Sequence, residues 1–150
     1  MRKILYMLAA VLTLASCGDR NGGQNGNNTE LTLEQKLYGQ WHSTSVAIDA
    51  DIYMSFAEDG TFELYQQIGE GAYRLYRGSW NLEDSLLTGK YNDGEDWAAG
   101  YEVSIEGSTL SLTSVNDTAE ESLYEKSEIP ESVKEGCVVE VKSFTNTPAL

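Results

Sequence analysis

Apolar and polar residues alternate along most of this chain, in short runs that end at Gly, Asp or Asn. In the clearest run, residues 101–106, every second residue is apolar, and the alternation resumes at Leu110 and Leu112 after a turn at Gly107. A period of two places one face of a strand in a core and the other face in water. The pattern therefore predicts antiparallel strands that are joined by tight hairpins.

Eight such strands follow one another at a spacing of about ten residues. They are residues 40–48, 52–57, 61–68, 72–82, 85–91, 97–106, 109–116 and 122–126, and residues 138–142 are a candidate for a ninth. Helix signals are few. Thr32 and Gln35 fit a capping box that opens a short turn over residues 33–38, and a second short turn begins at Pro130 and stops at Gly136.

A flat sheet of hairpin-linked strands would leave two edges whose backbone groups are unpaired, and such edges promote aggregation. A sheet that closes on itself removes both edges. We therefore expect an all-β fold, an antiparallel up-and-down (meander) β-barrel of about eight strands, with a short N-terminal helical turn before it.

Short motifs in this part of the chain resemble a known family. The sequence Leu37-Tyr38-Gly39-Gln40-Trp41 is similar to the Gly-x-Trp start of lipocalins. Residues 56–62 (FAEDGTF) and 78–80 (GSW) fit the order and spacing of the small lipocalin-like domains of bacterial lipoproteins. The resemblance covers residues 31–129. It implies a lipocalin-like barrel in which Trp41 plugs the closed end.

The first residues resemble the signal peptide of a Gram-negative bacterial lipoprotein. Leu14-Ala15-Ser16-Cys17 reads as a lipobox, and it follows the basic residues Arg2 and Lys3 and an apolar run over residues 4–14. That run is shorter than the about 20 residues that a membrane-spanning helix needs. The resemblance implies cleavage before Cys17 and acylation of that cysteine. The alternative is an ordinary secretory signal with a chance cysteine.

These features divide the chain into a signal peptide (1–16), a flexible tether after the lipidated cysteine (17–30), the barrel domain (31–142) and a C-terminal tail (143–150). Residues 18–30 contain no aliphatic or aromatic residue, which is typical of a linker. Gly18, in place of the aspartate that retains lipoproteins in the inner membrane of enteric bacteria, favours the outer membrane. The periplasmic and the outer face of that membrane both stay open.

Charge and composition exclude several classes of function. After processing, eight basic residues face 24 acidic ones, a net charge of −16, which repels nucleic acids. His42 is the single histidine, so a typical zinc site and a Ser-His-Asp triad are not expected. The acidic turn at residues 92–96 lacks the alternating ligands of an EF-hand and is read as a hairpin loop. Cys137 is interpreted as a small apolar strand residue. We expect no enzyme, no metal and no cofactor.

Two functions remain at this point. In the first, the barrel of a non-catalytic membrane-anchored lipoprotein binds a small apolar or amphipathic molecule, with Ser43, Ser45 and Ala47 leaving room for it. In the second, a filled barrel is an envelope interaction or structural protein without a ligand. The candidate interior residues are aromatic: Trp41, Phe56, Tyr76, Trp80 and Tyr101.

Two tripeptides resemble the Asp-Ser/Thr-aliphatic O-glycosylation motif that some anaerobic Gram-negative bacteria use on exported proteins. They place the acceptor hydroxyls at Ser85 and Thr118. Both residues fall in expected turns or strand starts, where a bulky glycan is tolerated.

Overall fold

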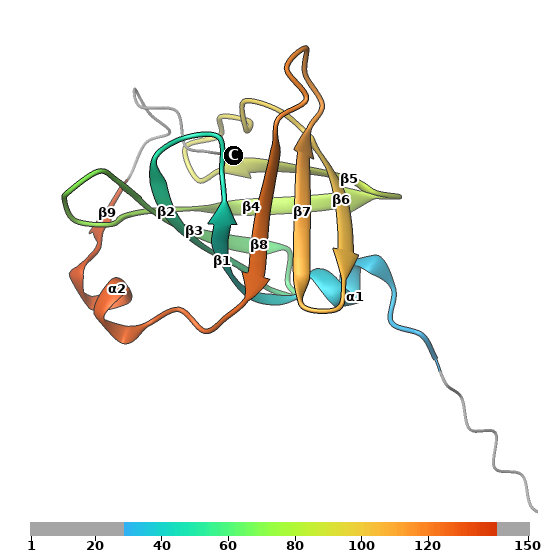
Figure 1. Ribbon diagram of the computed structural model, residues 1–150, viewed down its shortest axis with the longest axis horizontal. Coiled ribbons are helices and arrows are strands. Elements are labelled where there is room, and N and C mark those ends of the chain that lie inside the picture. The colour runs from blue at the N-terminus through green and yellow to red at the C-terminus, as the bar shows by residue number, and fades with distance from the viewer. Residues whose placement is uncertain (1–28, 141–150) are drawn as a thin grey trace, which may run out of the picture.

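Eight antiparallel strands form a closed barrel in the computed structural model, which describes residues 29–140. Each strand pairs with the next along the chain, and β1 (Gly39–Ser45) also pairs with β8 (Glu121–Lys126), which closes the ring. Figure 1 shows this meander with the short helix α1 (Leu33–Leu37) at one end. The predicted all-β meander barrel is therefore confirmed.

The strands between β1 and β8 match the predicted segments, with shifts at their ends. They are β2 (Ala50–Phe56), β3 (Thr61–Ile68), β4 (Arg74–Glu83), β5 (Leu86–Tyr91), β6 (Tyr101–Glu106) and β7 (Thr109–Ser114). The predicted bounds of β3 agree with the structure, because Gly60 and Gly69 adopt positive φ angles of 81° and 60° and turn the chain at both ends.

The first strand ends earlier than predicted. β1 stops at Ser45, after an irregularity in its pairing with β8 between Ser43 and Ser45. Ser45 and Ala47 are exposed, so neither residue lines the barrel interior. Ser43 is half-buried, and its hydroxyl accepts a hydrogen bond from the Ile52 amide at 3.0 Å. The expected strip of small interior residues along this strand is therefore wrong.

The sixth strand begins later than predicted, at Tyr101 instead of residue 97. The indole of Trp97 lies directly against Gly89 of β5, where an added Cβ would come within 2.1 Å of the ring. Residues 97–100 do not belong to a strand, although the Trp97 amide donates to the Gly89 carbonyl at 2.9 Å. The strand β5 pairs with β6 only through Leu86–Glu102 and Leu87–Tyr101.

The end of the barrel next to α1 is closed by side chains. Trp41 is buried on the barrel axis side of β1, and its indole N–H donates to the Leu37 carbonyl at 2.9 Å. The Lys126 ammonium lies 4.2 Å from the centroid of the Trp41 ring and donates to the carbonyls of Lys36 and Tyr38 at the end of α1. The predicted capping box of Thr32 and Gln35 is present at the start of α1.

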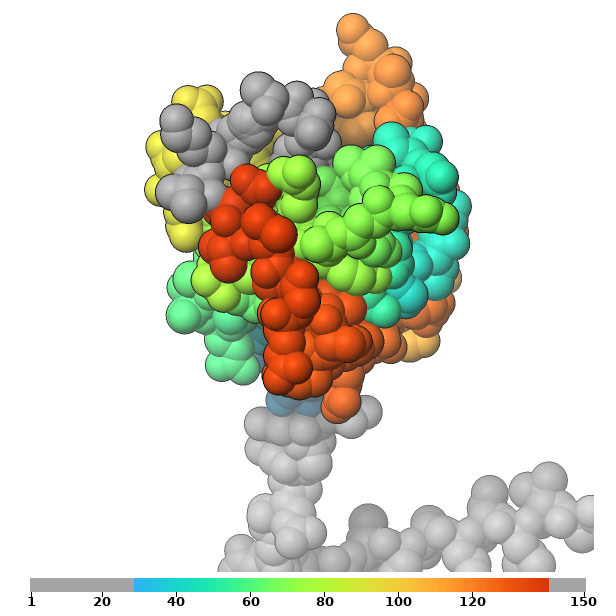
Figure 2. Space-filling model, turned by 90° about the vertical axis from the view of Figure 1, so that its left-hand side faces the viewer, coloured from blue at the N-terminus to red at the C-terminus, as the bar shows by residue number. Residues whose placement is uncertain are grey.

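After β8 the chain runs along the outside of the barrel, over residues 127–140, which we call the C-terminal strap. It contains α2 (Glu131–Gly136) and the two-residue strand β9 (Val138–Val139), which pairs in parallel with the start of β4. Ile129 and Val133 cover a small outer core of Tyr53, Tyr65 and Leu75. Figure 2 shows the strap beside the bright-green hairpin between β3 and β4.

The prediction that Cys137 is a strand residue is wrong. This residue caps the C-terminus of α2 and is not part of a strand, and its thiol approaches the Lys134 carbonyl at 3.1 Å. The observed ninth strand stops at Val139, and residues 141 and 142 of the predicted one lie outside the described part of the chain. No helix within residues 29–140 is long and apolar enough to cross a bilayer.

Candidate functional site

Three of the aromatic residues expected inside the barrel fill its closed half. Trp41, Phe56 and Trp80 are all buried, and the rings of Phe56 and Trp80 meet edge to face with centroids 5.6 Å apart. The Trp80 indole donates to the Thr61 carbonyl at 3.0 Å, so its polar atom is satisfied by the chain itself. These residues are packed as a core.

The other two, Tyr76 and Tyr101, lie in the opposite half of the barrel. The end of this half, away from α1, is called the mouth below. Both are buried, and each belongs to a network of rings that includes Tyr91 and Trp97. The Tyr76 and Tyr91 centroids are 6.1 Å apart, and those of Trp97 and Tyr101 are 6.3 Å apart.

A pocket of about 430 Å³ opens at this mouth, between the ends of β3 and β4 and the strap. Its walls include Gln66 and Ile68 from β3, Arg74 and Tyr76 from β4, and Val138 from β9. The volume lies within the range of about 300–1,000 Å³ that is usual for small-molecule sites. Among the aromatic residues expected from the sequence, Tyr76 is the one that lines this pocket.

Gln66 is the most informative residue of the pocket. It follows Phe62 and Leu64 on the inward face of β3, and its side chain is only 2% exposed. Its neighbour in the register on β2 is the fully buried Ile52. The amide nitrogen of Gln66 is buried without a hydrogen-bond partner among the described residues. A buried donor of this kind costs about 1–3 kcal/mol unless something accepts its hydrogen bond.

Further polar atoms in the mouth half are also buried without a hydrogen-bond partner. The Tyr91 hydroxyl and the Trp97 indole nitrogen are buried without partners within the described chain. The Tyr124 hydroxyl is also buried, and it comes near the Ser122 side chain without making a hydrogen bond of normal geometry. Most native buried polar groups are satisfied, so a group of unsatisfied donors in one half of a barrel requires an explanation.

Burial raises the pH at which these phenols would ionise. Desolvation, with a smaller contribution from the neighbouring Tyr101, raises the pKa of Tyr91 well above its ordinary value. Desolvation raises the pKa of Tyr101 to about 12 and raises the pKa of Tyr124 further. At neutral pH the interior therefore presents hydroxyl and N–H donors without charge.

The rim of the pocket carries both charge and apolar surface. Arg74 pairs with Glu140 of the strap, which holds the strap end against the start of β4. Ile68 is 54% exposed and Val138 is 52% exposed, although both line the pocket. The strap therefore forms one wall of the mouth.

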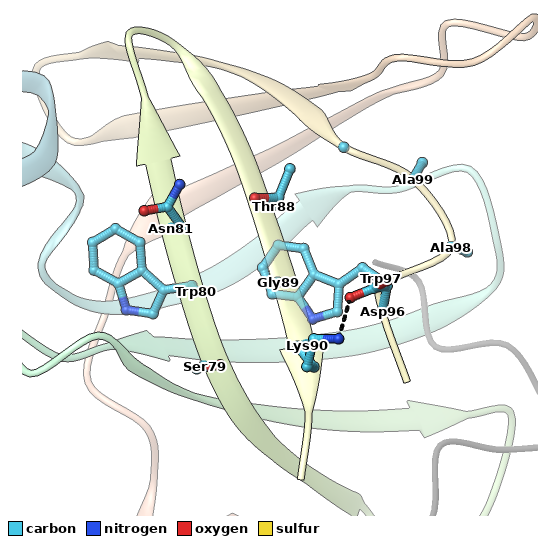
Figure 3. Close-up of a pocket in the computed structure, with 11 residues that line it drawn as sticks. Ser79, Trp80, Asn81, Thr88, Gly89, Lys90, Asp96, Trp97, Ala98 and Ala99 are labelled. Carbon is cyan, nitrogen blue, oxygen red and sulfur yellow. Dashed lines mark ion pairs between the residues drawn. The ribbon is translucent and has the colours of Figure 1, made fainter. Parts of the chain in front are cut away.

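A second hollow lies on the outer side of β4 and β5. It is an open groove of about 630 Å³ between these strands and residues 96–100, and Figure 3 shows the residues that line it. Ser79, Asn81 and Thr88 in its wall are exposed, and Lys90 pairs with Asp96 at 2.9 Å. Trp80 contributes to this groove as well as to the core.

The remaining candidates from the sequence are placed as follows. The Ser85 hydroxyl is half-buried and donates to Glu102, whereas Thr118 is exposed and donates to Asn116 at 2.7 Å. His42 lies on the outer face of β1, stacks on Tyr53 with centroids 4.1 Å apart and pairs with Asp51. Within residues 29–140, no group of three or more potential metal ligands lies together. Cys17 and its flanking residues lie outside the described part of the chain.

Gln66 is the site residue that sequence reasoning missed. It lies within the predicted strand over residues 61–68, and no role was assigned to it from the sequence. The parity of Phe62 and Leu64 carries the signal, because a strand of period two that faces the core with these residues also turns Gln66 inward.

No protein-family model matches this chain, and no curated protein does. Among solved structures, the chain is similar to YedD, a lipoprotein from Klebsiella pneumoniae subsp. pneumoniae MGH 78578. The two are 18% identical, the match covers 66% of this chain and 79% of that chain, and the TM-score is 0.45. The description of the barrel therefore depends on the strand pairing within this chain itself.

Proposed function

We propose that this chain is a lipid-anchored, non-catalytic binding protein of the cell envelope that holds a small amphipathic molecule in the mouth half of its barrel. The observation that supports this most strongly is the Gln66 amide, a buried donor without a partner at a pocket of about 430 Å³. If this position served packing alone, a Leu or Met side chain would make the folded protein more stable than a buried amide without a partner.

The alternative is an interaction protein with a filled barrel, and the packing of the closed half is consistent with it. Trp41, Phe56 and Trp80 pack that half as a core. It does not explain the unsatisfied donors of the mouth half, because a partner that docks on the outside would leave them buried and unpaired.

Replacing Gln66 tests the ligand proposal. Gln66→Met keeps the side-chain length and removes the unsatisfied amide, so we expect the free energy of unfolding to rise by about 1 kcal/mol. At the same time the affinity for an amphipathic probe such as 1-decanol falls at least tenfold. Urea denaturation and isothermal titration calorimetry measure the two quantities.

The matched control is Gln67→Met on the outer face of the same strand. The Gln67 amide donates to the Gly71 carbonyl, so this variant loses a surface contact and should bind 1-decanol unchanged. Equal binding by Gln66→Met and the wild type would exclude Gln66 from the site.

The anchor is tested separately, at Cys17. Acylation at this residue predicts that palmitate labels the wild type and that the protein is recovered with the membrane fraction. Cys17→Ala should lose both the label and the membrane retention, with the barrel still folded. Unchanged retention would contradict a lipid anchor. Protease treatment of intact cells then distinguishes the periplasmic from the outer face.

A further inference from the structure

We propose that the polar group of the ligand is a carboxylate, held at the mouth pocket by the side chains of Gln66, Arg74 and Tyr76. This inference rests on the proposed function and specifies the ligand class of the same site. It follows from the hydrogen-bond donors that these three neighbouring side chains leave unused.

The three side chains lie next to one another on one face of the pair of strands β3 and β4. Gln66 is the register partner of Arg74, and Leu64 is the register partner of Tyr76. Residues directly opposite each other in an antiparallel pair share a face, with Cβ atoms about 4.5–5.5 Å apart. Tyr76 lies two residues after Arg74 on β4, so it belongs to this face as well. All three residues line the pocket.

Each of the three has donors without a partner among residues 29–140. The Gln66 amide nitrogen is buried and makes no hydrogen bond there. The Tyr76 hydroxyl makes none with these residues either, although Tyr76 is only 4% exposed. Arg74 donates to Glu140 through Nη1, which leaves its Nε and Nη2 groups available. A carboxylate only accepts hydrogen bonds, and its two oxygens offer enough lone pairs for amide, phenol and guanidinium donors together.

Arg74 supplies the charge that an anionic ligand needs. A guanidinium and a carboxylate form charge-assisted hydrogen bonds, which are stronger than bonds between neutral groups. The Arg74 side chain is 54% exposed, so a carboxylate beside it keeps part of its hydration and avoids the large cost of a buried, unpaired charge. Glu70 also lines the pocket, but it lies in the exposed hairpin between β3 and β4, where water and salt screen its charge.

Glu140 is a carboxylate of the chain itself that already binds one side of this guanidinium. Tyr76 lies within range of both charges, because desolvation raises the pKa of Tyr76, the Glu140 carboxylate raises it further and the Arg74 guanidinium lowers it. A ligand carboxylate therefore shares Arg74 with Glu140 and competes with it. Removing the charge of Glu140 should consequently strengthen the binding of the ligand.

The apolar part of the ligand has a surface beside these donors. Ile68 and Val138 line the same pocket, and about half of each residue is exposed. Val138 is the register partner of Arg74 on β9, so this apolar surface adjoins the guanidinium. An aliphatic chain would cover both residues, which is favourable. The ligand class is therefore an aliphatic carboxylate.

Three compounds with one ten-carbon chain test the inference on the full chain by isothermal titration calorimetry. At pH 8 we expect decanoate to bind at least tenfold more tightly than 1-decanol. A pocket without the cation would show the opposite order, because the ionised group is more costly to desolvate than the hydroxyl. Decyltrimethylammonium should bind no more tightly than 1-decanol. A preference for it would mean that the acidic net charge of −14 governs binding, and would overturn the inference.

The ratio of the decanoate and 1-decanol affinities is the measurement for the variants, because a general change in packing affects both compounds. Arg74→Gln should reduce this ratio at least tenfold, and Glu140→Gln should increase it. The matched control is Arg77→Gln, on the outer face of the same strand. Arg77 pairs with Glu63 at 2.9 Å, and its loss should leave the ratio unchanged.

The outcomes separate the two proposals. If 1-decanol binds and decanoate binds no more tightly, or if Arg74→Gln keeps the wild-type ratio, or if Glu140→Gln does not raise it, the carboxylate assignment is wrong and the binding function stands. If none of the three compounds binds, the proposed function fails together with this inference.

Discussion

At the scale of single residues, Trp41 joins three elements of the closed end. It lies on β1, donates to the last turn of α1 through the Leu37 carbonyl and supports the Lys126 ammonium of β8 on its ring face. Burial lowers the pKa of Lys126, and the carbonyls of Lys36 and Tyr38 still hold its charged form. A single side chain therefore links the first strand, the last strand and the helix that precedes them.

We expect Trp41→Ala to lower the free energy of unfolding by about 3–5 kcal/mol, because it removes a large buried ring. Trp41→Phe keeps most of the apolar volume, and it should cost less than the alanine variant. Thermal and urea denaturation measure both variants. A Trp41→Ala protein with an unchanged melting temperature would contradict the role of this residue as the plug of the barrel.

Single residues also show where sequence reasoning stopped. The burial of Trp41 could be expected, because its Gly-x-Trp motif resembles the start of lipocalins, in which this position plugs the closed end of the barrel. The contact of Trp97 with Gly89 could not, since it joins a loop to a strand and follows from neither period nor turn chemistry. The unsatisfied state of Gln66 depends on its neighbours in space, and a single sequence does not list them.

At the scale of elements, β4 has the most varied pairing. Residues 74–79 pair with β3, residues 78–83 pair with β5, and Arg74 and Leu75 also pair with β9 of the strap. β9 thus occupies the stretch of the β4 edge that β5 leaves free. The eight barrel strands could be predicted from alternation. The parallel pairing of β9 could not, because a two-residue strand carries no period.

Loosening the strap should therefore affect the mouth and spare the barrel. Val133 is buried against the outer face, so we expect Val133→Ala to speed amide hydrogen exchange at Val138 and Glu140, which donate to the Tyr73 and Leu75 carbonyls. Amides of β7 and β8 should exchange at wild-type rates. Faster exchange throughout the sheet would mean that the strap is part of one cooperative unit with the barrel.

At the scale of the whole molecule, the two ends of the barrel differ. The end at α1, which follows the tether, is filled, and the opposite end holds the mouth pocket and the buried phenols. An anchor at Cys17 would therefore attach at the closed end, with the mouth at the far end of the domain.

The buried phenols make the molecule sensitive to alkali. Their pKa values are raised in the folded state, with that of Tyr101 at about 12 compared with 10.0 for a free tyrosine. Between these values the unfolded chain loses protons that the native chain retains, so the free energy of unfolding falls as pH rises. Each such tyrosine contributes a decrease of up to about 1.4 kcal/mol per pH unit.

Within residues 29–140 no tyrosine is exposed, and the pKa of each is raised, with desolvation as the largest cause. We therefore expect the tyrosinate absorbance of the native protein to rise above the ordinary tyrosine pKa, together with loss of near-ultraviolet circular dichroism. The same titration in urea, where all phenols are exposed, is the control and should show one stage near the ordinary value. A native protein that titrates over the same pH range as the protein in urea would mean that the mouth half is open to water.

The closed ring has a consequence for how fast the molecule folds. Thr44 of β1 bonds to Leu123 near the start of the last barrel strand, and the two residues are 79 positions apart in the chain. Each hairpin can form as soon as its own two strands exist, but this seam has to wait until all eight are present. Long-range pairings of this kind slow folding. Once β1 and β8 are paired, the eight-stranded ring has no edge strand that could separate first. We therefore expect the closed ring to slow unfolding as well as folding.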